Sequence, residues 1–330
     1  MRAAFIASYG DNSVVTHGEV DAPVPSETEV LIEVRAAGVN PVEIAMRQGH
    51  FHAAFPFKFP QVMGYDVAGV VISAPEGSGF EPGDDVYARL PNPRPGAYAE
   101  RAVVPIKLLA RMPRTLTYEE AASLPTVALT TWQAFVERAK LKPRERVLIQ
   151  AGAGGVGAFA IQLAKHMGAE VVATGSAGSQ AFMAQLGADR TVDYGTETFE
   201  SAGPFDIVYD GVCGPLTERG IDALRQGGRY VGLVRVADAQ AYREIGFPAP
   251  VAEGAAAGVK PFVERARERG AEFHGPLTRP DGAQLAEIAR VIDSVGIKAI
   301  VSKTYGLDGL ASAYDALAGG HTRGKLVIVP

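Results

Sequence analysis

Short apolar runs separated by glycine and proline characterise the first third of the chain. Arg2–Ala7 and Glu29–Val34 are both strand-like, and the second places Val30, Ile32 and Val34 at alternate positions. Further short runs, bounded by glycine turns, continue to residue 123. Many short strands joined by Gly and Pro turns predict a small barrel-like β domain. Within it, Asn40-Pro41 predicts a helix start, with Asn as the cap and Pro at the first helical position.

The pattern changes after residue 124, where compact apolar runs alternate with helix-length segments such as Leu216–Leu224. The strand-like runs are Val147–Ile149, Glu170–Thr174, Arg190–Asp193, Phe205–Asp210, Arg229–Val234 and a short one from Glu272 to Leu277. This alternation predicts parallel βαβ units with right-handed crossovers. The chain then closes with an amphipathic helix, Ala283–Ile292, and a strand, helix and strand at Ala299–Lys303, Leu307–Leu317 and Lys325–Val329.

One stretch joins a strand, a glycine turn and a helix. Val147–Ile149 leads into Gly152-x-Gly154-x-x-Gly157, and apolar residues then recur at helical spacing. In this context the glycines indicate a dinucleotide site, because they permit a tight turn and a close approach of pyrophosphate to the backbone. Free N–H groups and the helix dipole then hold the diphosphate. The expected contacts are Gly152, Gly154, Gly155, Val156 and Gly157. The alternative is a structural glycine loop without a ligand.

Composition narrows the class of protein. The chain has 330 residues, 47% of them hydrophobic, which is enough for two ordinary domains with proper cores. The net charge is −5, whereas proteins that bind nucleic acid are typically rich in Lys and Arg. No apolar run reaches the roughly 18 residues that span a bilayer. The first twenty residues contain no signal-peptide core, and a single cysteine, Cys213, excludes an intramolecular disulfide. We therefore expect a cytoplasmic protein that binds neither nucleic acid nor membrane.

Five motifs in a fixed order carry a family resemblance. They are Gly38-Val-Asn-Pro, Gly64-Tyr-Asp-Val-Ala-Gly-Val-Val, Gly83-Asp-Asp-Val-Tyr-Ala, Gly96-Ala-Tyr-Ala-Glu and Ala151-Gly-Ala-Gly-Gly-Val-Gly. Their order resembles the medium-chain dehydrogenase/reductase superfamily, and within it the zinc-independent quinone oxidoreductase branch that includes zeta-crystallin. The resemblance implies a Rossmann doubly wound parallel sheet at 124–277. It also implies a discontinuous GroES-like β-rich substrate domain at 1–123 and 278–330, with the site expected in the cleft between the two domains.

The same resemblance bears on zinc. Zinc alcohol dehydrogenases of the superfamily carry Cys where this chain has Asn40 and His where it has Tyr65. A catalytic zinc needs about three protein ligands, which Cys213 alone does not supply. The only histidines with ligand-like spacing, His50 and His52, lie in a Phe-rich loop and are expected to be exposed. The sequence therefore predicts no metal site.

Cofactor choice is read from the end of the second strand of the nucleotide domain. An NAD-specific fold places Asp or Glu there, whereas residues 173–180 contain no carboxylate. Ser176 and Ser179 offer hydroxyl donors, although the Lys or Arg that the family usually places near Ser179 is missing. By resemblance, Tyr194 and Arg323 match phosphate contacts, and an ordinary surface role is the alternative for each. These residues favour NADPH.

The remaining site residues are placed by topology or by resemblance. Ligands of such sheets bind beyond the carboxyl ends of the strands, which places Val212 in 211–213 and Leu233 in 233–234 near the cofactor. Cys213 is interpreted there as a small apolar filler. By resemblance, Thr130 lies beside the nicotinamide, the alternative being a threonine that bonds back to its own helix. Lys325, in the same motif as Arg323, is also assigned to the cofactor.

Two residues are assigned to the reacting groups. Asn40 is expected to contact the nicotinamide or the acceptor oxygen, and Tyr65 to be a proton donor or substrate wall, with a packed aromatic as its alternative. Related enzymes often have tyrosines where this chain has Ala45 and Phe51, which leaves a more apolar pocket.

Without a metal Lewis acid, the hydride of NADPH is expected to reduce conjugated acceptors, whose negative charge is delocalised. The sequence thus predicts a zinc-free NADPH-dependent reductase of small-molecule quinones or enones. The rivals are a 2-enoyl thioester reductase of the same fold and an NADPH-binding regulatory or structural protein. A short edge strand around Glu272–Gly275 further predicts a homodimer.

Overall fold

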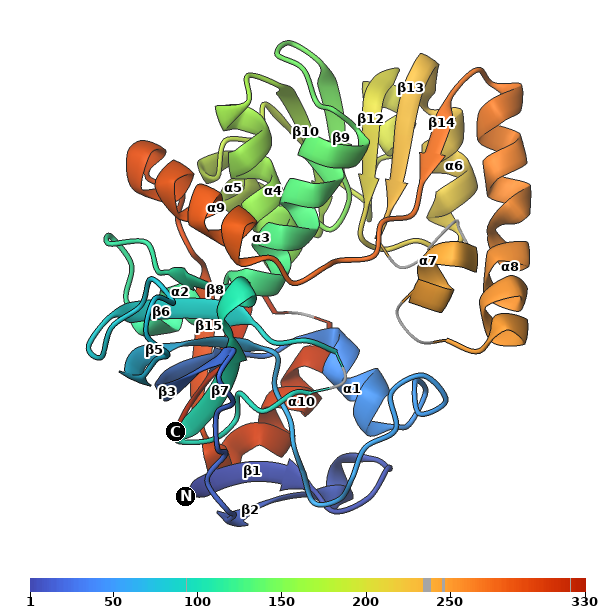
Figure 1. The fold of residues 1–330 in the computed structure, drawn as a ribbon. Helices are drawn as coiled ribbons and strands as arrows, with labels where there is room; N and C mark the ends of the chain where they lie inside the picture. The colour runs from blue at the N-terminus through green and yellow to red at the C-terminus, as the bar shows by residue number, and fades with distance from the viewer. Residues whose placement is uncertain (93, 234–238, 245–246, 321) are drawn as a thin grey trace. The chain divides into compact units, whose positions relative to one another are not determined.

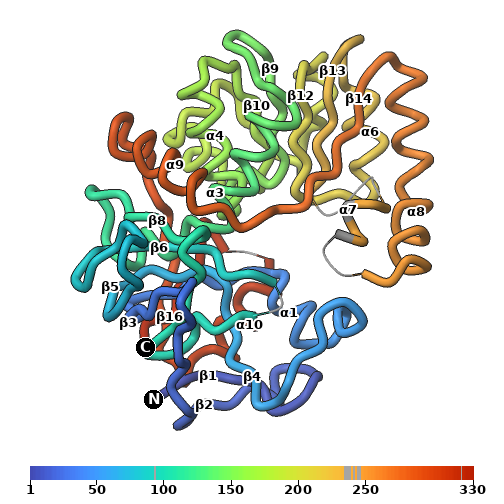
Figure 2. Tube along the Cα trace, viewed as in Figure 1, coloured from blue at the N-terminus to red at the C-terminus, as the bar shows by residue number. Residues whose placement is uncertain are grey.

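The chain forms two compact units. The computed structural model describes residues 1–330 except 93, 234–238, 245–246 and 321. The first unit comprises Met1–Leu129 and Arg279–Pro330, and the second comprises Thr130–Thr278. The boundaries expected from the sequence were 123/124 and 277/278. The trace in Figure 2 shows the red C-terminal segment, with α10 and β16, returning to the unit that contains the blue N-terminal strands.

The second unit contains a six-stranded parallel sheet in the order β11-β10-β9-β12-β13-β14. Its strands are β9 (Arg146–Ile149), β10 (Glu170–Gly175), β11 (Arg190–Asp193), β12 (Phe205–Asp210), β13 (Leu224–Gly232) and β14 (Glu272–His274). The chain runs outward from β9 to β11, then crosses back and continues outward from β12 to β14. That order is the Rossmann doubly wound arrangement, whose switch point lies between β9 and β12. The predicted fold class is confirmed. Val234, expected at the end of β13, lies outside the described residues.

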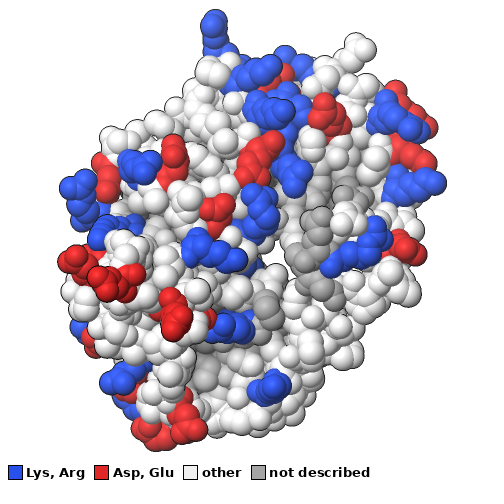
Figure 3. Space-filling model, in the orientation of Figure 1, with Lys and Arg blue, Asp and Glu red and all other residues white. Residues whose placement is uncertain are grey.

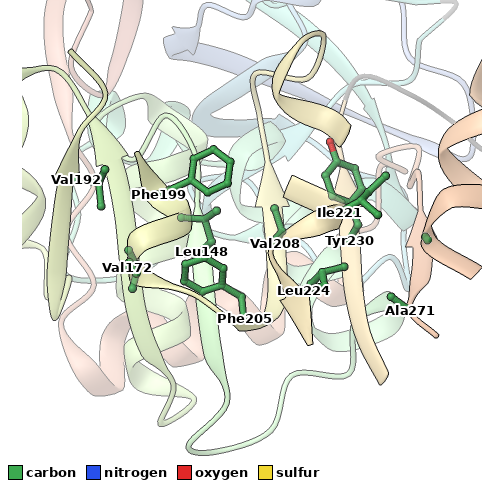
Figure 4. Packing of buried hydrophobic residues seen from close by; sticks show 12 residues of the cluster. Leu148, Val172, Val192, Phe199, Phe205, Val208, Ile221, Leu224, Tyr230 and Ala271 are labelled. Carbon is green, nitrogen blue, oxygen red and sulfur yellow. The ribbon is translucent and has the colours of Figure 1, made fainter. Parts of the chain in front are cut away.

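Helices cover both faces of this sheet (Figure 1). The helices of this unit are α4 (Gly155–His166), α5 (Gln180–Gln185), α6 (Leu216–Asp222), α7 (Ala239–Glu244) and α8 (Ala249–Glu268), preceded by the end of α3 (Pro125–Trp132) and a π-helical turn, Gln133–Arg138, and α7 packs against α8. Figure 4 shows the core on one face, where strand side chains meet residues of α6, α8 and the turn Phe199–Ala202. Its members are Leu148, Val172, Val192, Phe199, Ala202, Phe205, Val208, Ile221, Leu224, Tyr230, Ala266 and Ala271. Successive strand residues point to opposite faces, so Tyr209 packs on the other side, 4.8 Å from the Phe135 ring.

The first unit is built around β3, which pairs with β5, β7 and β16. Its strands are β1 (Arg2–Ile6), β2 (Val15–Glu19), β3 (Glu29–Gly38), β4 (Gln61–Val62), β5 (Asp66–Ser73), β6 (Asp85–Arg89), β7 (Arg101–Pro105), β8 (Leu109–Arg111), β15 (Val301–Gly306) and β16 (Lys325–Val329). Its helices are α1 (Pro41–Arg47), α2 (Tyr118–Ala122), α9 (Gly282–Val295) and α10 (Leu310–Ala318), with most of α3. This is the separate GroES-like β domain that the sequence predicts.

Strand register brings three distant segments together in this unit. Gly38, at the end of β3, lies opposite Asp66 at the start of β5 and opposite Val327 in β16. A Cβ at Gly38 would lie 2.4 Å from the carbonyl oxygen of Ala122 and 3.1 Å from the Cβ of Asp66. Only glycine permits this approach, and it sets Asn40, Asp66 and Lys325 at adjacent strand ends.

The surface carries charge of both signs. Lys and Arg side chains are interspersed with Asp and Glu on the face shown in Figure 3, and the totals of 32 and 37 are nearly balanced. Within the described residues, no helix has the length and apolar character needed to cross a bilayer.

Candidate active site

A buried polar network surrounds Asn40 in the first unit. The Asn40 amide nitrogen donates to Asp66 Oδ2 at 3.0 Å and to Glu43 Oε1 at 3.2 Å. Its amide oxygen accepts from Lys325 Nζ at 2.6 Å. All four side chains are buried. Because polar groups removed from water need partners, each member of this network depends on the others.

Asn40 starts α1 as the sequence predicts, but its side chain does not cap the helix. Its backbone is extended, Pro41 occupies the first helical position, and the side chain makes no capping hydrogen bond. The amide group instead donates to Asp66 and Glu43 and accepts from Lys325. The predicted helix start at Asn40 is confirmed, whereas the predicted capping role of its side chain is wrong.

The Lys325 ammonium is enclosed by oxygen atoms. It donates to the carbonyl of Val39 and to Asn40 Oδ1, both at 2.6 Å, and lies 3.8 Å from Asp66 Oδ2. Burial lowers the pKa of Lys325, whereas Asp66 and Glu43 raise it. The sequence assigned Lys325 to the cofactor. Its ammonium group has two hydrogen-bond acceptors and one carboxylate partner inside the unit, and its contact with the cofactor stays a prediction.

Glu43 is the second carboxylate of the network. Its Oε1 also accepts from the backbone N–H of Tyr65 at 3.3 Å, and its Oε2 accepts from the hydroxyl of Tyr98. Burial raises the pKa of Glu43 to about 7, while the Tyr98 hydroxyl and Lys325 oppose that rise and Asp66 adds to it. Sequence reasoning missed Glu43, Asp66 and Tyr98, although all three lie in or beside the family motifs.

Tyr65 belongs to the core of this unit. Its side chain is fully buried, and its hydroxyl donates to the carbonyl of Asn92 at 2.8 Å. The Arg89 guanidinium lies over its ring at 5.5 Å. The expected role as a proton donor is not supported, because the single hydroxyl proton already has an internal acceptor. The packed-aromatic alternative fits the geometry.

In the second unit, the glycine stretch forms the turn that the sequence predicts. Gly152 and Gly157 are packing glycines: a Cβ would lie 2.8 Å from Met183 Sδ at Gly152 and 2.3 Å from the Ala151 carbonyl oxygen at Gly157. At Gly154 the nearest atom to a Cβ is 3.5 Å away, so this glycine is not needed for packing. Its open side suits a ligand that approaches the backbone.

The start of α4 offers unused donors. The backbone N–H groups of Gly155, Val156 and Gly157 have no acceptor among the described residues, and α4 has no side-chain cap. Donors at a helix N-terminus, next to an open glycine, fit the diphosphate of a dinucleotide. These chain atoms therefore fit the cofactor that the sequence predicts.

Three of the predicted phosphate contacts lie together at the ends of β10 and β11. Ser176 Oγ is 3.1 Å from Ser179 Oγ, and the backbone N–H of Tyr194 donates to the carbonyl of Gly175. The Tyr194 side chain is 70% exposed and Ser176 is exposed, whereas Ser179 is buried. Arg323 is exposed in the turn before β16 of the first unit, and its contact with the phosphate stays a prediction.

Asp210 organises the switch point. Its Oδ1 accepts from the backbone N–H groups of Val212 and Cys213 at 2.8 and 2.7 Å, and its Oδ2 accepts from the Tyr230 hydroxyl at 2.5 Å. The backbone carbonyl of Asp210 accepts from the N–H of Leu233. Val212 is half-exposed and Cys213 is buried, as a small filler would be. The sequence analysis missed Asp210, although its place as the last residue of a buried strand at the switch point was a usable signal.

Thr130 lies at the boundary of the second unit. Its hydroxyl is 2.8 Å from that of Thr278, the last residue of the same unit. Both termini of the unit are therefore joined at this point. The contact with nicotinamide stays a prediction.

Comparisons with known proteins agree with this architecture. The family model described as "Alcohol dehydrogenase GroES-like domain" matches residues 26–114, and the one described as "Zinc-binding dehydrogenase" matches residues 186–328. Human "NAD(P)H oxidoreductase RTN4IP1, mitochondrial" is 33% identical over 99% of this chain and 89% of that protein. The Arabidopsis thaliana "NADPH-dependent alkenal/one oxidoreductase, chloroplastic" is 30% identical over 100% of this chain and 80% of that protein. The quinone oxidoreductase of Coxiella burnetii superposes with a TM-score of 0.87 at 29% identity, covering 100% of this chain and 99% of that one.

A GroES-like unit joined to a Rossmann unit with an open glycine turn defines an oxidoreductase of the medium-chain dehydrogenase/reductase superfamily. The chain belongs to that superfamily, in its quinone oxidoreductase-like branch.

The zinc in one family description does not fit the residues at Asn40. A catalytic zinc takes imidazole, thiolate or carboxylate ligands and leaves one position open. Here Asn40 and Tyr65 already have internal hydrogen-bond partners, and the Lys325 ammonium lies among the available oxygens. In the part of the chain that the structure describes, no three His, Cys, Asp or Glu side chains form a metal-binding group.

Replacing Glu43 with Gln is expected to change how stability depends on pH. The folded pKa of about 7 lies above the ordinary 4.5, so folding favours the protonated acid. The stabilisation from this proton is complete below about pH 4.5 and is lost as the pH rises to about 7, a change of about 3 kcal/mol. Glu43→Gln mimics the neutral acid, so its free energy of unfolding should lack this dependence on pH. Urea unfolding of both proteins between pH 4.5 and 8 measures the difference. Parallel curves of stability against pH would contradict the raised pKa of Glu43.

The two kinds of glycine predict different defects. Gly154→Ala should lower the free energy of unfolding by at most about 1 kcal/mol, as a change at a helix cap does. Its added methyl group should keep the diphosphate of NADPH away from the backbone N–H groups. If one hydrogen bond to the charged diphosphate is lost, NADPH should bind about ten- to a hundredfold more weakly. Gly157→Ala, which forces a backbone clash, should instead lower stability by about 1–3 kcal/mol. Thermal unfolding and NADPH titration measure both effects, and unchanged NADPH affinity in Gly154→Ala would leave that glycine without a cofactor role.

Proposed function

We propose that the protein is an NADPH-dependent, zinc-independent reductase of quinones or α,β-unsaturated carbonyls. The observation that carries the proposal is the network of Asn40, Asp66 and Lys325, in which an ammonium and a carboxylate engage Asn40, the residue that by resemblance replaces a zinc-binding cysteine. An ammonium in that place neutralises carboxylates but leaves no Lewis acid to stabilise an alkoxide. Acceptors with delocalised charge are therefore favoured over simple ketones.

The cofactor, when bound, supplies a hydride to the conjugated acceptor. The proton that completes the reduction comes from solvent water. The chain would contribute by binding and orientation: the N–H groups of Gly155, Val156 and Gly157 would hold the diphosphate, and Ser176 and Tyr194 would line the region of the adenosine ribose. Asn40 orients the nicotinamide end.

Three observations support the choice of NADPH. No carboxylate follows β10 in residues 173–180, so a 2′-phosphate is not repelled. Ser176 and Tyr194 are exposed at the adjoining strand ends, and Arg323 offers a planar charged group suited to phosphate. The name of the Arabidopsis relative includes NADPH, and that of the human relative leaves NADH or NADPH open.

The two rival functions keep the same fold. A 2-enoyl thioester reductase would use the same cofactor on an acyl thioester. An NADPH-binding regulatory or structural protein would bind the cofactor with little turnover. The names of the quinone oxidoreductase and the alkenal/one oxidoreductase favour the proposed substrate class over both.

A homodimer and a cytoplasmic location are further parts of the proposal. The strand β14 ends the sheet order among the described residues, and such an edge can pair with a second copy. A monomer alone in sedimentation at micromolar protein would contradict the dimer. The cytoplasmic location stays a prediction, tested by fractionating cells that express the intact protein.

A substrate panel tests the proposed reaction. NADPH oxidation should be measurable with quinones and enones, negligible with simple ketones, and unaffected by a strong chelator, because no step depends on a metal. Enoyl thioesters in the same panel examine the first rival, and absence of turnover with every acceptor would favour the second. Activity confined to simple alcohols or ketones, and abolished by the chelator, would overturn the proposal.

Arg323→Ala tests cofactor choice. Loss of a hydrogen bond to a charged group costs about 1.5–3 kcal/mol, so NADPH should bind about ten- to a hundredfold more weakly while NADH is nearly unaffected. The exposed Arg101, in β7, supplies a matched control as Arg101→Ala. Equal losses for both cofactors in Arg323→Ala would show that Arg323 is structural. A native preference for NADH would show that the end of β10 was misinterpreted.

A further inference from the structure

The hydrogen-bonding capacity of Asn40 is almost fully occupied. Its amide nitrogen has two hydrogens, and these are donated to Asp66 Oδ2 and Glu43 Oε1. Its oxygen has two lone pairs, and one accepts from Lys325 Nζ. The side chain therefore has one unused position, which is an acceptor.

Charge fixes the orientation of this amide. Two carboxyl groups lie at its nitrogen and one ammonium lies at its oxygen. A rotation of the amide by half a turn would point N–H groups at the ammonium and the oxygen at the carboxyl groups. The contacts with the Lys325 ammonium and the Asp66 carboxylate would then be repulsive, so the observed orientation is favoured.

We infer that Lys325 and Asp66 are positioning residues, which hold the Asn40 amide so that it presents only its oxygen to a ligand, and that this oxygen accepts an N–H of the nicotinamide carboxamide. A quinone or enone oxygen is itself an acceptor and cannot pair with Asn40 in this state. Of the two contacts expected for Asn40, the structure thus favours the nicotinamide over the substrate oxygen. The inference rests on the proposed use of NADPH, whose nicotinamide carries the required donor.

The test compares two cofactors that differ at one group. The reduced 3-acetylpyridine analogue of NADPH replaces the carboxamide NH₂ with a methyl group and keeps every phosphate. Its dissociation constant and that of NADPH are measured by titration for the wild type and for Asn40→Ala, Lys325→Met and Asp66→Asn. Lys107→Met, at an exposed position outside the network, is the matched control for removal of a lysine charge. Circular dichroism establishes that each variant is folded.

The wild type and Lys107→Met should bind the analogue about 2- to 12-fold more weakly than NADPH, the range for one neutral hydrogen bond. That ratio should fall to about one in Asn40→Ala, and toward one in Lys325→Met and Asp66→Asn, because the amide can then turn. A merely structural role would weaken both cofactors equally and leave the ratio unchanged. Should one network variant fail to fold, the other decides.

Three results would overturn the inference: equal binding of the two cofactors by the wild type, a preserved ratio in Asn40→Ala, or a preserved ratio in the folded Lys325→Met or Asp66→Asn proteins. Binding is measured without an acceptor, so a failure here is separate from failure of the substrate panel. An enzyme that reduces enones but shows no preference between the cofactors would retain the proposed function and lose this inference.

Discussion

The buried ammonium of Lys325 is the interaction on which the first unit depends. It links the end of β3, the start of β5 and the start of β16 through Val39, Asn40 and Asp66. Removing one partner from such a buried set leaves an uncompensated charge, which is strongly destabilising. The same contact holds the amide of Asn40, which we propose to contact the nicotinamide. The group that stabilises this unit is thus also the one proposed to orient Asn40, and Gly38 permits the close strand packing that places it.

The two units differ in how many of their polar groups remain available to a ligand. The Rossmann unit leaves backbone donors open at Gly155 to Gly157 and keeps Gly154 free of close contacts. It fixes its switch point through the buried carboxylate of Asp210. The GroES-like unit instead satisfies almost every polar atom around Asn40 internally. Binding energy is thus expected chiefly from the Rossmann unit, and orientation from the GroES-like unit.

Local patterns predicted much of the fold, and long-range contacts account for most of what was missed. The strands Arg190–Asp193 and Phe205–Asp210 and the glycine turn are encoded in short apolar runs, so their positions followed from the sequence. The helix α8 was not predicted, because it is rich in Ala and Gly, contains Pro261 and buries little beyond Ala252, Val259 and Ala266. The network around Asn40 was missed because strand register, not sequence spacing, brings its members together. Tyr65 was misassigned since no local pattern shows whether a tyrosine hydroxyl already has a partner.

The contact between Asn40 and Lys325 spans 285 residues and therefore has a consequence for synthesis. A nascent chain carries the carboxylates of Glu43 and Asp66 long before the strand that neutralises them emerges from the ribosome. The whole Rossmann unit lies between the two, and domains generally fold as units during synthesis. The GroES-like unit is thus expected to reach its native state last, when its final six residues become available.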